Sequence, residues 1–277
     1  MLNRSIPPAF SRNFSFELPE PEVIRAGSSH FIFLSGVQQE VFKIEVVLRA
    51  GKWYEPRSGL AHFTSLMLNK GTSKRNAGEI AELVDYYGSQ IEIVSGYDFA
   101  SISLYGLQKN IEKIVPLFLE ILSDPTFPEG ELDLQKQIFL QNLEINEQKN
   151  SFVASKLIRR NIFGASHPYG SSIEKENVEG LSVSDLKSFF LTNFSPHEIY
   201  SVGNLNPQQV RWCVDQFAQL RPGEPAPAKN APITAGGSVE HIAKPDSIQS
   251  TIRFGKSTIN RNHPDYFPLL LSNHILG

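Results

Sequence analysis

The sequence predicts an α+β fold in which helices pack against a largely antiparallel sheet. Three observations lead to this prediction. Some segments alternate apolar and polar residues over the length of a strand, others repeat apolar residues at the helical period, and strands and helices alternate along the chain. We expect a first domain over residues 1–220, a linker over 221–238, and the beginning of a second domain over 239–277.

The expected strands are short runs rich in β-branched and aromatic residues, bounded by polar or glycine-containing turns. Two of them meet around Gly96, where a hairpin is indicated. The predicted strands cover residues 28–36, 41–51, 89–96, 97–107, 197–205 and 246–258, with a further strand at residues 15–18.

The expected helices begin at capping residues and end near glycine or a polar turn. Ser58 is the predicted N-cap of the first helix, Ser182 and Asp185 have the spacing of a capping box, and Pro116 kinks its helix or lies near its first turns. The predicted helices cover residues 58–69, 76–88, 109–124, 129–150, 151–164, 182–194, 206–220 and 263–277.

Composition excludes several classes of function. The chain has 277 residues and a net charge of −3, which gives no field to gather nucleic acid or anionic lipid. A single cysteine, Cys213, permits no internal disulfide and no cysteine-based zinc cluster. No segment approaches 18 apolar residues, so no membrane span is expected. The N-terminus lacks the apolar core of a signal peptide, so we expect a cytoplasmic protein, with a periplasmic or organellar location left open.

The linker before the expected second domain and the C-terminus of that domain each have a distinct composition. Residues 221–237 hold four prolines and three glycines, a composition typical of an extended, semi-rigid linker. At the C-terminus, Leu269, Leu270, Leu271 and Ile275 have no following element to pack against, so we expect a fragment of a longer protein. The alternative is a final helix capped by Gly277.

Residues 59–72, GLAHFTSLMLNKGT, follow the pattern of a metal-binding helix without its ligands. In an H-x-x-E-H arrangement two histidines on one helical face bind zinc, and the glutamate is the general base. Here His62 is the first histidine, Ser65 stands at the glutamate position and Leu66 at the second histidine position. A serine hydroxyl cannot replace a carboxylate base, and leucine binds no metal. From the residues alone, this is a buried helix with a locally hydrogen-bonded histidine.

The segment from Gly59 to Gly96 closely resembles the zinc-ligand segment of the pitrilysin/insulinase family of inverted-motif metallopeptidases, which includes the mitochondrial processing peptidases. The resemblance extends over residues 14–277, and residues 239–277 resemble the opening of the family's second homologous half. The matching positions of the motif are Gly59, Leu60, Ala61, His62, Phe63, Met67, Lys70, Gly71 and Thr72.

The resemblance implies that the chemical positions of the family have been lost. The family's spacing places its third zinc ligand, a glutamate, at Asn142. The neighbouring Glu144 and Glu147 are turned away from that position at the helical period and are expected on a solvated face. We therefore expect no metal, no cofactor and no catalytic residue in this chain.

The resemblance further implies a non-catalytic subunit that pairs with a catalytic HxxEH subunit and acts on peptides, with zinc only in the partner. An extended peptide would add to one strand, formed by Gln90, Ile91, Glu92, Ile93, Val94 and Ser95. Glu92 either tunes substrate preference or guards the strand against aggregation. Two alternatives stay open: a structural or assembly scaffold, and an enzyme with a different chemistry, for which no nucleophile is evident near His62.

Overall fold

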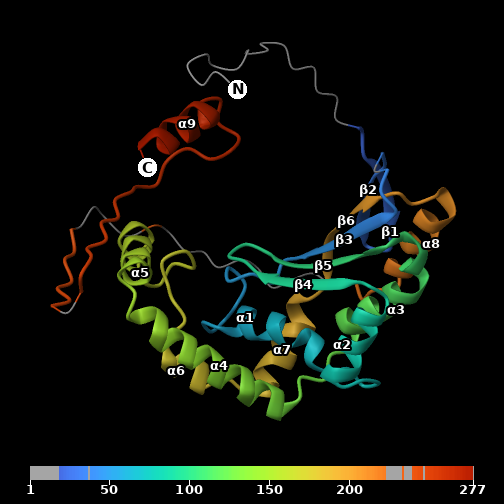
Figure 1. Ribbon diagram of the computed structural model, residues 1–277, viewed down its shortest axis with the longest axis horizontal. Coiled ribbons are helices and arrows are strands. Elements are labelled where there is room, and N and C mark those ends of the chain that lie inside the picture. Colours follow the sequence, from blue (N-terminus) through green and yellow to red (C-terminus); the bar gives the residue numbers. More distant parts are fainter. Residues whose placement is uncertain (1–18, 37, 223–232, 234–238, 246, 277) are drawn as a thin grey trace, which may run out of the picture.

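A six-stranded sheet, in the order β1-β2-β6-β3-β5-β4, forms the centre of the molecule (Figure 1). The computed structural model describes residues 19–36, 38–222, 233, 239–245 and 247–276. The strands are β1 (Glu22–Ala26), β2 (Ser29–Leu34), β3 (Val41–Leu48), β4 (Gln90–Ser95), β5 (Ala100–Leu107) and β6 (Pro196–Gly203).

The sheet is largely antiparallel, as predicted. Among the described strands only β2 and β6 pair in parallel, whereas β6 is antiparallel to β3, and β5 is antiparallel to both β3 and β4. In β3 the alternation of the sequence sets the two faces: Phe42, Ile44, Val46 and Leu48 are buried, and the residues between them are half-buried.

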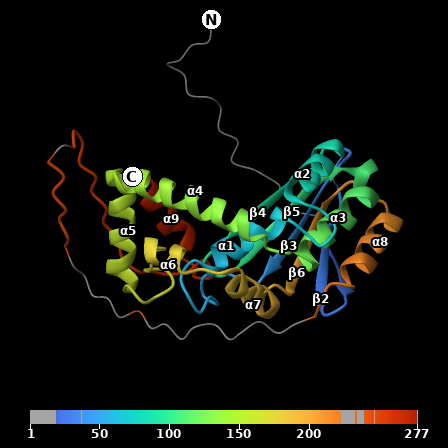
Figure 2. The same ribbon diagram turned by 90° about the horizontal axis from the view of Figure 1, so that it is seen from below.

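Helices cover one face of the sheet (Figure 1). The long helix α4 extends away from the sheet and carries α5 at its far end (Figures 1 and 2). The helices are α1 (Leu60–Met67), α2 (Ala77–Tyr86), α3 (Ile111–Ser123), α4 (Glu129–Glu147), α5 (Asn150–Phe163), α6 (Lys175–Glu179), α7 (Val183–Asn193), α8 (Pro207–Phe217) and α9 (Tyr266–Leu276). Leu68–Lys70 and Gln108–Asn110 are 3₁₀ turns.

The core fills the space between this helical layer and the sheet. Buried rings from both layers meet there: Phe31 of β2 contacts Phe217 of α8 at 5.9 Å between ring centroids, and Phe118 of α3 contacts the same ring at 6.3 Å. The amphipathic pattern of α3 predicts its buried face, which includes Ile114 and Val115. Pro116 lies within the helix, on its exposed side.

Two local predictions about helix starts have opposite outcomes. The capping box of Ser182 and Asp185 is confirmed, since the serine hydroxyl accepts from the Asp185 amide at 3.2 Å. The prediction that Ser58 caps α1 is wrong: the N-cap is Gly59, which has φ 98°, a left-handed conformation that favours glycine. The sequence reading also missed β1 and the short helix α6.

The strand predicted at residues 246–258 is absent from the described residues 247–258, which form no regular secondary structure. A strand needs a neighbour to pair its backbone, and the exposed Ile248, Ile252 and Phe254 lie beside no strand of the described chain. The strand predicted at 15–18 and most of the linker lie outside the described residues.

Residues 240–245 and 247–249 lie against the junction of α4 and α5. Glu240 forms an ion pair with Arg160 at 3.0 Å. The Nζ of Lys244 donates to the carbonyls of Glu147 and Gln148 at 2.8 and 3.1 Å, where it complements the negative end of the α4 dipole. In the part of the chain that the structure describes, no helix is long and apolar enough to cross a membrane.

Candidate functional site

The helix α1 is fixed at its N-terminus by a buried carboxylate. Glu55, which is 2% exposed, accepts hydrogen bonds from the amides of Gly59 and Ala61 at 3.1 and 3.0 Å. A carboxylate at this end of a helix accepts hydrogen bonds from amides that have no helical partner. Its negative charge also interacts favourably with the positive end of the helix dipole. The position of His62 is therefore set by Glu55 and by the turn at Gly59.

His62 packs against aromatic rings. Its imidazole lies 5.2 Å from the ring of Phe63 and 5.3 Å from the ring of Phe139 on α4, measured between centroids. Burial lowers the pKa of His62 below its ordinary value of 6.5, because a charged ring loses hydration. None of the described residues hydrogen-bonds its ring nitrogens, so the expected local hydrogen bond is replaced by ring contacts.

The two positions that follow His62 carry no metal-binding chemistry. Ser65 is 1% exposed, and its Oγ has no hydrogen-bond partner among the described residues, as is also true of the Oγ1 of Thr64. Leu66 is half-buried. Ser65 therefore lies within the core, where a hydroxyl can neither accept a proton as a carboxylate does nor bind zinc strongly.

On α4, Phe139 is the residue in ring contact with His62. Asn142 lies three residues further along the same helix and its side chain is exposed. Glu144 and Glu147 are also exposed, and Glu147 forms an ion pair with Lys156 at 2.9 Å. Sequence reasoning missed Phe139; the available signal was its position one helical turn before Asn142, on a neighbouring part of the same face.

The residues around His62 do not fit a zinc ion. Zinc sites in proteins use three or four nitrogen, sulfur or oxygen ligands. Beside the imidazole of His62, the side chains at the motif positions supply a hydroxyl and an aliphatic chain, and α4 supplies a phenyl ring. Among the described residues, no group of three or more histidine, cysteine, aspartate or glutamate side chains is placed to hold a metal ion.

The predicted peptide-binding strand is β4, and it forms one end of the sheet beside α1. Its exposed residues Gln90, Glu92 and Val94 alternate with the half-buried Ile91, Ile93 and Ser95. Glu92 accepts a hydrogen bond from the hydroxyl of Tyr105 at 3.0 Å.

The free edge of β4 presents backbone groups of alternate residues. The amide of Gly96 donates to the carbonyl of Phe99 at 2.9 Å. In an antiparallel pair, residues at two-residue intervals from such a bonded pair point their backbone groups to the partner strand. The backbone groups of Ile91, Ile93 and Ser95 therefore point away from β5. Among the described residues, no other strand pairs with this edge.

Two family models match the chain. The model described as "Insulinase (Peptidase family M16)" matches residues 33–182, and the model described as "Peptidase M16 inactive domain" matches residues 180–277. The boundary near residue 180 falls before β6, which lies inside the six-stranded sheet.

Curated relatives are distant but cover most of the chain. A zinc protease of Mycobacterium leprae, described as uncharacterised, is 22% identical over 79% of this chain and 51% of its own length. The mitochondrial-processing peptidase subunit beta of Dictyostelium discoideum is 23% identical over 97% of this chain and 61% of its own length. Subunit 1 of the mitochondrial cytochrome b-c1 complex of Bos taurus is 22% identical over 70% of this chain and 41% of its own length. The chain thus spans about half the length of the curated relatives it matches first.

Solved structures share the fold. A peptidase M16 inactive domain from Pseudomonas fluorescens superposes with a TM-score of 0.70 and 24% identity, covering 76% of this chain and 52% of that one. A protease from Helicobacter pylori superposes with a TM-score of 0.69 and 18% identity, covering 78% of this chain and 54% of that one.

Proposed function

This chain belongs to the insulinase family of peptidases, family M16, and on that premise we propose that it is a non-catalytic, zinc-free subunit of a heteromeric metallopeptidase. It would form part of a peptide-binding chamber together with a catalytic partner that carries an intact HxxEH motif. Zinc would be bound only by that partner.

The observation that carries the proposal is the surroundings of His62. A hydrolytic zinc centre needs three protein ligands, an open position for water and a base. In this chain Ser65 and Leu66 stand at the positions of the base and the second histidine, and Phe139 packs on the imidazole. Burial favours the neutral imidazole, yet a single neutral imidazole does not retain zinc.

The edge of β4 is the feature that fits a role in peptide binding. An extended peptide can pair with the outward backbone groups of Ile91, Ile93 and Ser95, which supplies affinity without dependence on peptide sequence. The exposed side chains of Glu92 and Val94 would then contact the peptide's own side chains. An unpaired edge is otherwise a site of aggregation, so its occupation by peptide also protects the subunit.

Names of relatives support a role within an assembly. The Dictyostelium protein is named as a subunit of a processing peptidase. The bovine protein is named as a subunit of the cytochrome b-c1 complex, and this likeness supports the second candidate, a structural scaffold that has no part in proteolysis.

The deciding experiment compares the isolated chain with a mixture containing an HxxEH family member from the same organism. We expect less than about 0.1 zinc per chain by elemental analysis, because the site has one weak ligand. We also expect no hydrolysis of a quenched fluorescent peptide by the chain alone. The mixture should hydrolyse the peptide faster than the partner alone.

Two results would contradict the proposed role as a peptidase subunit. Chelator-sensitive hydrolysis by the chain alone contradicts a non-catalytic role. A stable complex with the HxxEH protein that leaves its hydrolysis of peptide unchanged rejects the peptidase role and supports the scaffold.

A further inference from the structure

A groove between α2, α3 and the end of α8 combines an apolar floor with positive charge. Its volume is about 520 Å³, within the range of about 300 to 1,000 Å³ typical of ligand sites. The floor is formed largely by Leu83, Tyr87, Pro116, Leu119 and Leu220. No lining residue belongs to α1, α4 or β4, so the groove is separate from the helix of His62 and from the peptide-binding edge.

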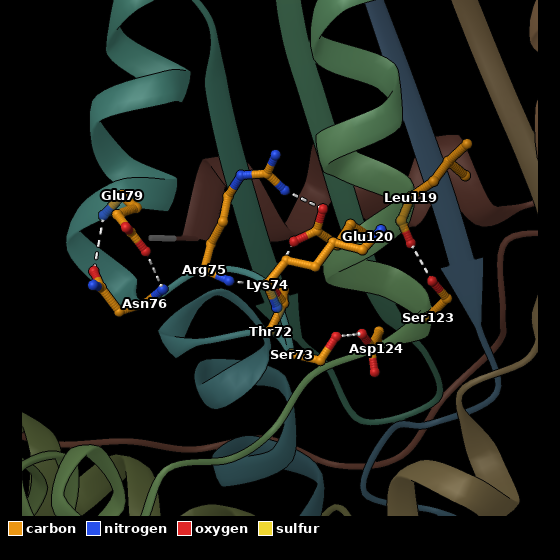
Figure 3. A network of polar contacts seen from close by, with 10 residues as sticks. All are labelled: Thr72, Ser73, Lys74, Arg75, Asn76, Glu79, Leu119, Glu120, Ser123 and Asp124. Atoms are coloured by element: carbon orange, nitrogen blue, oxygen red, sulfur yellow. Dashed lines mark hydrogen bonds and ion pairs between the residues drawn. The ribbon is translucent and has the colours of Figure 1, made fainter.

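The two carboxylates in the groove are already engaged (Figure 3). Glu120 accepts a hydrogen bond from the hydroxyl of Thr72 at 2.5 Å and forms an ion pair with Arg75. Asp124 accepts a hydrogen bond from the hydroxyl of Ser73. Both carboxylates therefore hold the loop before α2 against α3.

Two lysines in the lining keep their charge free. Lys74 and Lys113 are exposed, and neither Nζ has a carboxylate within 4 Å or a hydrogen-bond acceptor among the described residues. With Arg75, Glu120 and Asp124 included, the lining has three cations against two anions. This local excess of positive charge contrasts with the net charge of −3 of the whole chain.

The two free cations lie toward different ends of the groove. Lys113 precedes Glu120 by seven residues, which corresponds to about 10 Å along the helix axis, and Lys74 adjoins the arginine that pairs with Glu120. A single carboxylate cannot satisfy both lysines, so the spacing favours an elongated ligand with several negative charges and an apolar side.

The groove also offers a side chain that suits a peptide backbone. The side-chain amide of Gln216, which lines the opposite wall on α8, has no hydrogen-bond partner among the described residues. This amide group can both donate to and accept from a peptide backbone.

We propose that this groove binds a short, extended acidic peptide segment whose apolar side chains lie on the floor and whose carboxylates meet Lys74 and Lys113. In an extended chain successive side chains point to opposite sides, so a segment that alternates acidic and apolar residues matches a floor of Leu83, Tyr87 and Pro116 under a cationic rim. The inference is independent of the proposed function.

Fluorescence anisotropy with a fluorescein-labelled Glu-Leu-Glu-Leu-Glu peptide and the full chain tests the proposal. We expect saturable binding that weakens about tenfold in the Lys74→Gln, Lys113→Gln double variant, since rim ion pairs contribute modestly and roughly add. Raising the salt concentration should weaken binding as well. The Gln-Leu-Gln-Leu-Gln peptide should bind at least about tenfold more weakly for the same reason.

A matched control makes the outcome decisive. Lys109→Gln removes an exposed lysine close to α3 that does not line the groove, and it should leave binding unchanged. Circular dichroism verifies that each variant is folded. Equal binding of the two peptides, an unaffected double variant, or no saturable binding of the acidic peptide would overturn the proposal.

Discussion

The imidazole of His62 on α1 and the phenyl ring of Phe139 on α4 lie 5.3 Å apart, at an interplanar angle of 56°. This contact joins the motif helix to the helix on which the family places its third ligand. Phe63 completes the cluster, with its ring 5.4 Å from that of Phe139. His62 thus meets α4 through an aromatic contact at Phe139, three residues before Asn142.

Replacing Phe139 by alanine should destabilise the protein by about 2 kcal/mol, below the range for a fully buried phenylalanine because this side chain is half-buried. The same variant should raise the pKa of His62 toward 6.5, because water regains access to the ring. Urea denaturation measures the first effect and a histidine NMR titration the second. Phe139→Leu, which keeps most of the apolar cover, serves as the control; an unchanged His62 titration in Phe139→Ala would contradict the role of this ring.

The lowered pKa of His62 predicts a pH dependence of stability. Because the unfolded chain binds a proton at this residue more readily than the folded chain does, the free energy of unfolding is greatest above the unfolded pKa, near 6.5, and falls as the pH drops through 6.5 toward the folded pKa. The variant His62→Gln should lose less stability than the wild type between about pH 7 and pH 5. Urea denaturation at both pH values measures the difference, and parallel losses in the two proteins would refute the prediction.

Glu55 is expected to be essential to the N-terminus of α1. Glu55→Ala leaves the amides of Gly59 and Ala61 without their acceptor in a buried site, and should lower the free energy of unfolding by about 2–3 kcal/mol. Glu55→Gln keeps one acceptor oxygen and should lower it less. The exposed Glu112 provides the control through Glu112→Gln; similar losses in all three variants would argue against a specific role.

The edge of β4 can be blocked without disturbing the ladder to β5. Ser95→Pro removes an amide that points to the free edge, where proline is tolerated in a sheet. In the complex with a catalytic partner, this variant should raise the KM for a quenched fluorescent peptide about tenfold, the effect of losing roughly one backbone hydrogen bond. Ser95→Ala retains the amide and should match the wild type. A KM unchanged by proline would exclude this edge from peptide binding.

Cys213 should report on unfolding. It is fully buried on α8, and burial raises the pKa of its thiol to about 12, so the reactive thiolate is nearly absent at neutral pH. We expect no reaction with a thiol reagent in buffer and complete reaction in denaturant, which can be followed by absorbance. Rapid labelling of the native protein would show that the packing of α8 against the sheet opens readily.

Most of the fold could be predicted because local patterns and the burial of residues agree. The alternation in β3 and the apolar stripe of α3 correctly specify buried faces. The strand predicted at 246–258 was wrong because alternation reports suitability for pairing, and pairing also requires a neighbouring strand. The predicted N-cap, Ser58, is one residue before the observed N-cap, Gly59. The prediction failed because the deciding acceptor, the carboxylate of Glu55, lies outside the helix.

For the candidate site, the sequence indicated the missing ligands and could not indicate what replaced them. Ser65 and Leu66 are readable from the motif itself. Phe139 comes from a helix distant in sequence, and its contact with His62 depends on how α4 packs beside α1. The spacing from the motif indicates which turn of that helix lies near His62, whereas the packing of the two helices determines which residue makes the contact.

The position of β6 has a consequence for how this protein is made. It lies between β2 and β3, yet it is the last strand of the sheet to leave the ribosome. Until residue 203 has been synthesised, the nascent chain holds two separate pieces, β1 with β2 and β3 with β5 and β4, whose facing edges have no partner. Closure of the sheet therefore waits until β6 has been synthesised, and until then the growing polypeptide exposes two unpaired strand edges.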